Sequence, residues 1–359
     1  MGDTRTVPLI HGPQDITAQW CDVALADRLG GAHVRAVRLD PVGTGQVADT
    51  VRIHLTYDRP GAGPPTLIAK IPSADPTSFE AARATRLYEV EASFYRDLAG
   101  QLPVRTPACF YAHHDLETNA YIVVLEDVAP AEQGDQMCGC SPADIAAAVD
   151  ELVLLHGPGW GDPALLDIEW LNRSTGDVSA TVGLLEMAVV PFRERYGDRL
   201  DAETMALVDR FMPRLADHLS YRPRPWTIVH VDFRADNLLF GLDRVVVVDW
   251  QTVGLGPGPG DLAYLLGASL RPEDRRLAES ELVDRYVAGL RAQAVTVAPD
   301  DVWTLYRHYA FSGLVMAIAA SFLVRRTERG DEMFMTMASR HAHQALDLDS
   351  ESLIGRLPG

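Results

Sequence analysis

The 359-residue chain contains almost no lysine. It has 32 basic residues, and Lys70 is the only lysine among them, so that all the others are arginine. Acidic residues number 50, which gives a formal net charge of −18. Such an acidic chain repels phosphate backbones and anionic headgroups, and we therefore expect neither nucleic acid nor a membrane surface as its partner.

Cysteines and long apolar runs are equally scarce. Among the four cysteines, Cys138 and Cys140 form one close pair, but the second pair that a metal site of this type needs is absent. With no signal-peptide pattern at the start, we expect a cytoplasmic protein with reduced thiols. The longest apolar stretch, 311–324, is interrupted by serine and glycine and is too short to span a membrane. It predicts a buried helix.

The most informative segment runs from His230 to Asn237 and reads HVDFRADN. The pattern H-x-D-x4-N puts the carboxylate of Asp232 and the amide of Asn237 on one loop. The apolar run Val245–Val248 then ends at a second carboxylate, Asp249. A polar turn between two buried strands would accommodate any one of these residues, but the full set at this spacing indicates a catalytic loop.

The chemistry that fits this set is phosphoryl transfer. That reaction needs a group that orients the attacking hydroxyl and oxygen ligands for magnesium. Asp232 fits the first role, and Asn237 and Asp249 fit the second. Magnesium keeps several of its waters, so two protein ligands together with phosphate oxygens suffice.

Lys70 supports the same interpretation from a distant part of the chain. It lies in the apolar segment Leu67–Ile71, where a buried cation is unfavourable unless it is paired. The ammonium group is a compact charge on a flexible stem and can reach phosphates where a planar guanidinium does not fit. The alternative is a lysine that has survived by chance at a strand edge.

The sequence pattern changes near residue 128, from strand-rich to mainly helical. We therefore expect an α+β fold with a lobe over residues 1–127 and a larger lobe over 128–359. Helices are predicted over 16–29, 78–100 and 143–156, and over most of the chain beyond Asp261. Alternation and turn residues predict strands over 34–39, 47–57, 66–71, 108–113 and 121–125.

Several segments together resemble the aminoglycoside phosphotransferase superfamily, and within it the ecdysteroid-kinase-like branch. The resemblance covers nearly the whole chain. It implies a bilobal protein-kinase-like fold, with a small N-terminal antiparallel-sheet lobe, a mainly helical C-terminal lobe and ATP bound between them. The matching segments are Gly43–Gln46, Lys70, Glu91–Tyr95, Leu125–Asp127, Leu155–His156 with Trp160, His230–Asn237, Val248–Gln251 and Gly260–Ala263.

The same resemblance implies a role for individual residues. Lys70 would contact the α- and β-phosphates and be held by Glu91, with Glu89 as the rival partner. The turn Gly43, Thr44 and Gly45, together with Glu126, would also belong to the nucleotide site, whereas Asn237 and Asp249 would hold Mg²⁺. Asp232 would orient the acceptor, and Arg234 would either contact the transferred phosphoryl group or form a salt bridge with Asp236. His230 would brace the loop, and Asp261 would cap a helix and also bond the loop.

Departures from the protein-kinase pattern indicate a small substrate. Only eleven residues separate Asp249 from Asp261, which leaves no room for an activation loop, and Trp-Gln follows Asp249 in place of Phe-Gly. We therefore expect an ATP- and magnesium-dependent phosphotransferase that acts on a hydroxyl of a small molecule, either aminoglycoside-like or steroid-like. The acidic second lobe favours an amine-bearing acceptor, whereas the ecdysteroid-kinase-like branch favours a more apolar one. A non-catalytic nucleotide-binding pseudokinase is the alternative.

Overall fold

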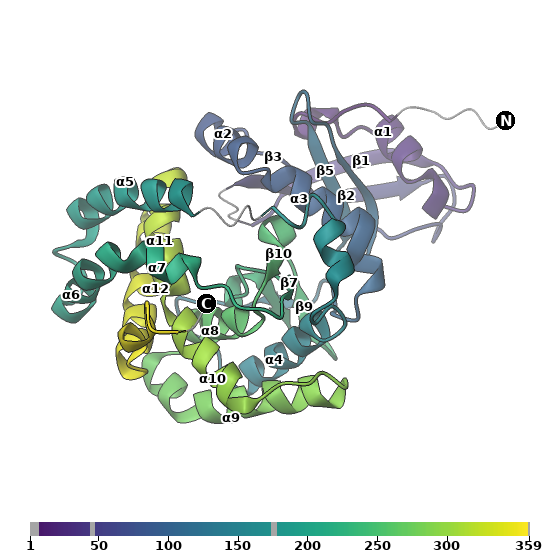
Figure 1. The fold of residues 1–359 in the computed structure, drawn as a ribbon. Coiled ribbons are helices and arrows are strands. Elements are labelled where there is room, and N and C mark those ends of the chain that lie inside the picture. The colour runs from purple at the N-terminus through teal and green to yellow at the C-terminus, as the bar shows by residue number, and fades with distance from the viewer. Residues whose placement is uncertain (1–6, 44–46, 174–177, 358–359) are drawn as a thin grey trace. The chain divides into compact units, whose positions relative to one another are not determined.

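The computed structural model describes residues 7–43, 47–173 and 178–357. Figure 1 follows the chain through these residues. They form two compact units, which are not simple halves of the sequence. The first unit contains the described part of Met1–Gln101 with Thr106–Ala129 and Asp249–Gln251, and the second contains Leu102–Arg105 and the described parts of Pro130–Val248 and Thr252–Gly359.

An antiparallel sheet of five strands forms the centre of the first unit. The strand order is β1-β2-β3-β5-β4, so β3 lies in the middle of the sheet. The strands are β1 (Val34–Pro41), β2 (Ala48–Tyr57), β3 (Thr66–Pro72), β4 (Cys109–His114) and β5 (Tyr121–Glu126).

The two faces of β3 differ in character because successive side chains point to opposite sides of a sheet. Leu67, Ala69 and Ile71 lie in one buried cluster together with Trp20 of α1 (Ala18–Ala24). Lys70 alternates with these residues and therefore lies on the opposite face. This register explains how a single charged residue is tolerated in an apolar central strand.

The helix predicted over 78–100 is interrupted in the structure. α2 (Pro76–Ala84) ends before Arg86, whose backbone adopts a left-handed conformation with φ of 59°. α3 (Leu87–Ser93) follows and continues into a π-helical turn over Phe94–Leu98. The prediction of one helix was wrong because residues 85–86 fit a helical pattern, and only the backbone geometry marks the break. The helix predicted over 16–29 is likewise shorter, with α1 ending at Ala24 before a separate 3₁₀ turn.

The second unit is mainly helical, and its described residues contain two small sheets of short strands. Its short strands pair as β10-β7 and as β6-β8-β9. The strands are β6 (Glu132–Gln133), β7 (Thr227–Val229), β8 (Leu238–Phe240), β9 (Val246–Val247) and β10 (Gly254–Gly256). The helices are α4 (Pro142–His156), α5 (Ser179–Tyr196), α6 (Ala202–Phe211), α7 (Leu215–Ser220), α8 (Pro259–Ser269), α9 (Pro272–Ala292), α10 (Pro299–His308), α11 (Ser312–Leu323) and α12 (Glu328–Asp347).

Helix α8 lies at the centre of this unit. Its residues are buried on every side except at Gly260, which is typical of a helix surrounded by other elements. It packs against α4, α9, α10, α11 and α12, and α11 lies beside α12 in Figure 1. The predicted buried helix near residue 311 is confirmed as α11. Within the described residues, no helix has the length and apolar character that crossing a membrane would require.

The predicted fold class is therefore confirmed. A small antiparallel sheet with few helices makes up the first unit, and the second unit consists mostly of helices. The strands between residues 34 and 126 were all predicted to within a few residues, because each is short, apolar on at least one face and bounded by turn residues.

Candidate active site

An ion pair between Lys70 and Glu91 lies on the α3 side of the sheet in the first unit. Lys70 Nζ is 2.7 Å from Glu91 Oε1 and also 2.7 Å from Asp249 Oδ1. The Glu91 side chain is only 1% exposed and that of Lys70 is 14% exposed. Glu89, the rival partner, is paired instead with Arg86 at 2.6 Å.

Both carboxylates act on the charge of Lys70. Burial by itself lowers the pKa of the ammonium, but Asp249 and Glu91 more than offset this effect, and the net result is a raised pKa. Lys70 is therefore a permanent cation in this environment. That property suits a group that contacts phosphates.

Glu91 is held by two further donors that the sequence pattern does not reveal. The hydroxyl of Tyr121 donates to Oε2 at 2.5 Å, and the backbone N–H of Trp250 donates to Oε1 at 3.2 Å. The Trp250 ring stacks on Phe94, with centroids 4.0 Å apart and planes inclined by 10°. Phe94 lies three residues after Glu91, in the turn that continues α3. Residues at this spacing share a face of a helix, so Phe94 and Glu91 lie on the same side.

The glycine turn lies partly outside the described residues. Gly43 is described and has a φ of 75°, a conformation that favours glycine, whereas Thr44 and Gly45 lie outside. Glu126 is at the end of β5, and its carboxylate accepts the backbone N–H of Ala108 at 3.0 Å. The structure thus gives Glu126 a local structural contact.

In the second unit, the segment after β7 forms a tightly held loop. Val231 has a φ of 73°, which is unfavourable for a β-branched residue and persists only where the surroundings impose it. Asp261 supplies that constraint by accepting the N–H groups of His230 at 2.6 Å and of Val231 at 2.9 Å. The His230 ring lies 3.0 Å from the carbonyl oxygen of Val248, and this contact braces the loop as predicted.

Asp261 corrects one expectation from the sequence. It bonds the loop, but it does not cap α8. The N-cap of that helix is Gly258, and Asp261 lies inside the first turn. Its side chain points to the loop because both of its oxygens are used by the loop's N–H groups.

The Asp232 carboxylate is surrounded by donors. Arg234 Nε lies 2.9 Å from Oδ1, and the hydroxyl of Tyr264 donates to the same oxygen at 2.8 Å. Asn237 Nδ2 donates to Oδ2 at 2.9 Å and to the Asp232 backbone carbonyl at 2.8 Å. The spacing of the motif therefore brings carboxylate and amide into direct contact.

Asn237 is oriented in a way that suits a magnesium ligand. Both of its side-chain hydrogen bonds use Nδ2, which directs Oδ1 away from Asp232 and leaves Oδ1 without a donor among the described residues. Amide and carboxylate oxygens are donors that Mg²⁺ accepts. Asp249 offers a second carboxylate, which is 28% exposed and bonds Lys70 through Oδ1. The donor chemistry of these two residues fits magnesium.

Of the two roles that the sequence left open for Arg234, the structure shows the salt bridge to Asp236. In addition to Asp232, its Nη1 lies 3.1 Å from Asp236 Oδ2 and 2.6 Å from Gln136 Oε1. Its side chain is 14% exposed. The structure thus shows a salt-bridge role for Arg234, and contact with a phosphoryl group remains a proposal.

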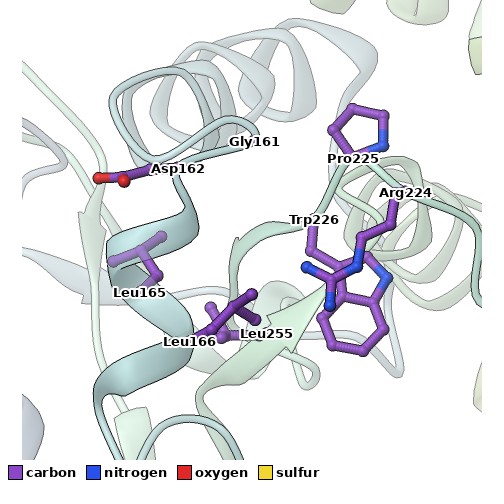
Figure 2. A pocket seen from close by; sticks show the side chains of 8 residues that line it. All are labelled: Gly161, Asp162, Leu165, Leu166, Arg224, Pro225, Trp226 and Leu255. Atoms are coloured by element: carbon purple, nitrogen blue, oxygen red, sulfur yellow. The ribbon is translucent and has the colours of Figure 1, made fainter.

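A separate cavity of about 320 Å³ lies elsewhere in the second unit (Figure 2). Leu165, Leu166 and Leu255 line it together with Trp226, whose ring is covered by the guanidinium of Arg224 at 3.9 Å. Asp162 lies at its edge. None of the predicted site residues lines this cavity.

Two tyrosines of the site were missed by reasoning from the sequence. Tyr121 and Tyr264 are both buried tyrosines in apolar segments, 30 and 32 residues away from the carboxylates that they bond. A tyrosine in such a segment is typical of a core position, so no local signal distinguishes it.

Comparison with solved structures supports the fold. A protein of Ralstonia eutropha JMP134 assigned as an aminoglycoside phosphotransferase is 16% identical, with a TM-score of 0.54 over 91% of this chain and 97% of its own. Choline kinase from Cryptosporidium parvum Iowa II is 10% identical, with a TM-score of 0.56 over 89% and 91%. Plasmodium vivax ethanolamine kinase is 10% identical, with a TM-score of 0.53 over 85% and 81%.

Comparison by sequence gives the family. No curated protein matches the chain. The model of the phosphotransferase enzyme family, in contrast, matches residues 39–296, a range that includes Lys70, Glu91, the loop from His230 to Asn237, and Asp249. With well over half of its length matched, the chain belongs to the phosphotransferase enzyme family.

Proposed function

We propose that this protein is an ATP- and magnesium-dependent kinase that transfers the γ-phosphate to a hydroxyl group of a small molecule. The observation that carries the proposal is the Asp232 carboxylate, which is fixed by three donors, one of them the amide of Asn237. Membership of the phosphotransferase family supports it. A kinase of this type would use cytoplasmic ATP, and we propose that location.

In this proposal each unit supplies a different part of the chemistry. Residues 1–127 form the nucleotide-binding lobe, in which Lys70, held by Glu91, contacts the phosphates. Gly43, Thr44, Gly45 and Glu126 belong to the same nucleotide site. Residues 128–359 form the catalytic and substrate-binding lobe.

Asp232 would accept a hydrogen bond from the acceptor hydroxyl and orient it toward the phosphorus. In a loose transition state such orientation contributes more than strong base catalysis. Arg234 would steady the transferred phosphoryl group. Asn237 and Asp249 would hold magnesium, which neutralises charge on the phosphates when it is bound.

The neighbours and the charge of the chain support an amine-bearing acceptor. Choline kinase and ethanolamine kinase, to which the fold is similar, act by name on small amino alcohols. The net charge of −18 favours a cationic acceptor of this kind. Aminoglycoside-like compounds share the combination of amine and hydroxyl, and a steroid-like alcohol is the acceptor that the ecdysteroid-kinase-like resemblance favours.

The test is magnesium-dependent ADP release with a panel of amino alcohols, aminoglycosides, sterols and sugars. We expect one class to stimulate release, and Asp232→Asn to reduce the stimulated rate on the order of 100-fold or more while ATP still binds. Asp201→Asn makes the same chemical change at a helix N-cap outside the proposed site, where asparagine caps equally well, and should leave the rate unchanged. Full turnover in Asp232→Asn would contradict the proposal.

The non-catalytic alternative has no observation in its favour. Loss of Lys70, Asp232 or Asp249 would mark a pseudokinase, and all three are present. ATP binding without ADP release under any condition of the panel would be the result that supports it.

A further inference from the structure

Side chains of helix α8 form hydrogen bonds with the proposed catalytic loop, both with its backbone and with one of its side chains. Asp261 and Ser269 accept backbone N–H groups of the loop, the latter from Ala235 at 2.9 Å. Between these two anchors, Tyr264 bonds the carboxylate of Asp232 itself. Because α8 is buried on nearly every side, these contacts fix the loop to a rigid part of the second unit.

Tyr264 is suited to act as a permanent hydrogen-bond donor. Its side chain is 1% exposed, and its ring lies beside that of His341 with centroids 5.4 Å apart. Burial raises the pKa of the phenol well above its ordinary value, and the nearby charge of Asp232 raises it further. The hydroxyl therefore keeps its proton and donates a hydrogen bond to the carboxylate.

The hydrogen bonds to Asp232 are distributed unequally between its two carboxylate oxygens. An ionised carboxylate has about four lone-pair positions, two on each oxygen. Tyr264 and Arg234 take both positions of Oδ1, whereas Asn237 takes one position of Oδ2. Among the residues that the structure describes, Oδ2 is consequently the oxygen that keeps an unused acceptor position.

We propose that Tyr264 is a positioning residue for phosphoryl transfer. Together with Arg234 it occupies Oδ1 of Asp232 and fixes the carboxylate so that the acceptor hydroxyl donates to Oδ2. During transfer, the acceptor oxygen forms its bond to the γ-phosphorus while the bond from that phosphorus to the ADP oxygen breaks, and the hydroxyl proton passes to Oδ2. This inference rests on the proposed function and specifies the geometry of the acceptor at that site.

The first test removes the hydroxyl and keeps the ring. With MgATP and the acceptor that gives most ADP release in the panel, Tyr264→Phe should lower kcat roughly 10- to 100-fold, because a carboxylate free to rotate presents the wrong oxygen. KM values for ATP and acceptor should stay within about threefold of wild type, since neither ligand contacts Tyr264 in the proposed geometry. An unchanged kcat would overturn the proposal.

Tyr306→Phe is the matched control. Tyr306 is also fully buried and donates its hydroxyl to a carboxylate, that of Glu279 at 3.0 Å, but it belongs to α10 and does not contact the loop. A similar loss of thermal stability with unchanged kcat is expected for this variant. An equal fall in kcat for Tyr306→Phe and Tyr264→Phe would show a general effect of losing a buried hydroxyl and would overturn the positioning role.

A second test does not depend on turnover. A double-mutant cycle of Tyr264→Phe and Asp232→Ala, followed by urea unfolding, should show coupling on the order of 3- to 100-fold in the unfolding equilibrium constant. Zero coupling would refute the hydrogen bond. If wild type released no ADP with any acceptor, the proposed function would fail and the catalytic role of Tyr264 with it, whereas the cycle would still report whether the bond exists. The two failures are thus distinguishable.

Discussion

Replacing Lys70 by methionine tests the ion-pair arrangement in the first unit. The substitution keeps the length and most of the volume of the side chain but removes the charge. Glu91, which is 1% exposed, then loses its cation, and Asp249, which is 28% exposed, loses the same partner. The change therefore leaves one buried carboxylate and one partly buried carboxylate without the ammonium.

The expected loss of stability follows from these exposures. Breaking a fully buried ion pair typically costs about 3–5 kcal/mol. Glu91 keeps the donors Tyr121 and Trp250, and the Asp249 pair is partly screened by solvent, so we expect a loss just below that range, roughly 2–3 kcal/mol. Urea unfolding read by hydrogen exchange in peptides that cover α3 measures this loss where it arises.

Two comparison variants make the result specific. Arg83→Met removes the ion pair between Arg83 and Glu80, whose side chains are 62% and 57% exposed respectively. This change should alter the free energy of unfolding very little. Lys70→Arg keeps the charge and should retain most of the stability, but it should lower kcat about 10-fold or more, because the planar guanidinium does not replace the ammonium at the phosphates. A Lys70→Met protein as stable as wild type, or a Lys70→Arg protein with unchanged kcat, would refute this reasoning.

Two further predictions concern the second unit. The pKa of His218 is lowered well below its ordinary value and those of His308 and His341 are lowered to about 4, in each case chiefly by burial. The contribution of these histidines to stability should therefore be fully present above about pH 7.5 and be lost as pH drops toward 4, because the unfolded chain takes up these protons first. At pH 5 the loss is roughly 2 kcal/mol each for His308 and His341, and urea midpoints at several pH values would show it. Asp261→Ala should lower the free energy of unfolding by roughly 2–4 kcal/mol, since two buried N–H groups lose their acceptor. The same preparation should release less ADP, and a variant with normal thermal unfolding would contradict this prediction.

The strands and the class of fold could be predicted because their signals are local. In β3, for example, apolar residues alternate with Lys70. This pattern by itself predicts that one face of the strand is buried and that Lys70 lies on the other. The break between α2 and α3 could not be predicted in the same way. Arg86 is an ordinary helix former, so its identity gives no signal for the left-handed backbone that the structure shows.

The same distinction applies to the candidate site. Asp232 and Asn237 are five residues apart on one loop, so their spacing predicts contact, and the structure shows it. The strained backbone at Val231 has no such signal, since valine there suggests a continued strand. Its conformation becomes understandable only once Asp261 is found to accept its N–H.

The carboxylate of Glu91 in the first unit and that of Asp232 in the second accept hydrogen bonds from the same three kinds of donor. Nothing in the sequence indicates this similarity. Glu91 is bonded by a cation, a buried tyrosine hydroxyl and an N–H group. Asp232 is bonded by Arg234, Tyr264 and the amide of Asn237, which are again a cation, a buried tyrosine hydroxyl and an N–H group.

The tyrosine is the member that gives each carboxylate a fixed orientation. A cation balances the charge of the carboxylate, whereas a fully buried phenol donates from a position that the packing of its ring fixes. Burial raises the pKa of Tyr121 and of Tyr264 well above the ordinary value, so both remain donors. Tyr121→Phe should therefore loosen the Lys70 pair in the way that Tyr264→Phe loosens Asp232, and only the second should change which carboxylate oxygen meets the acceptor.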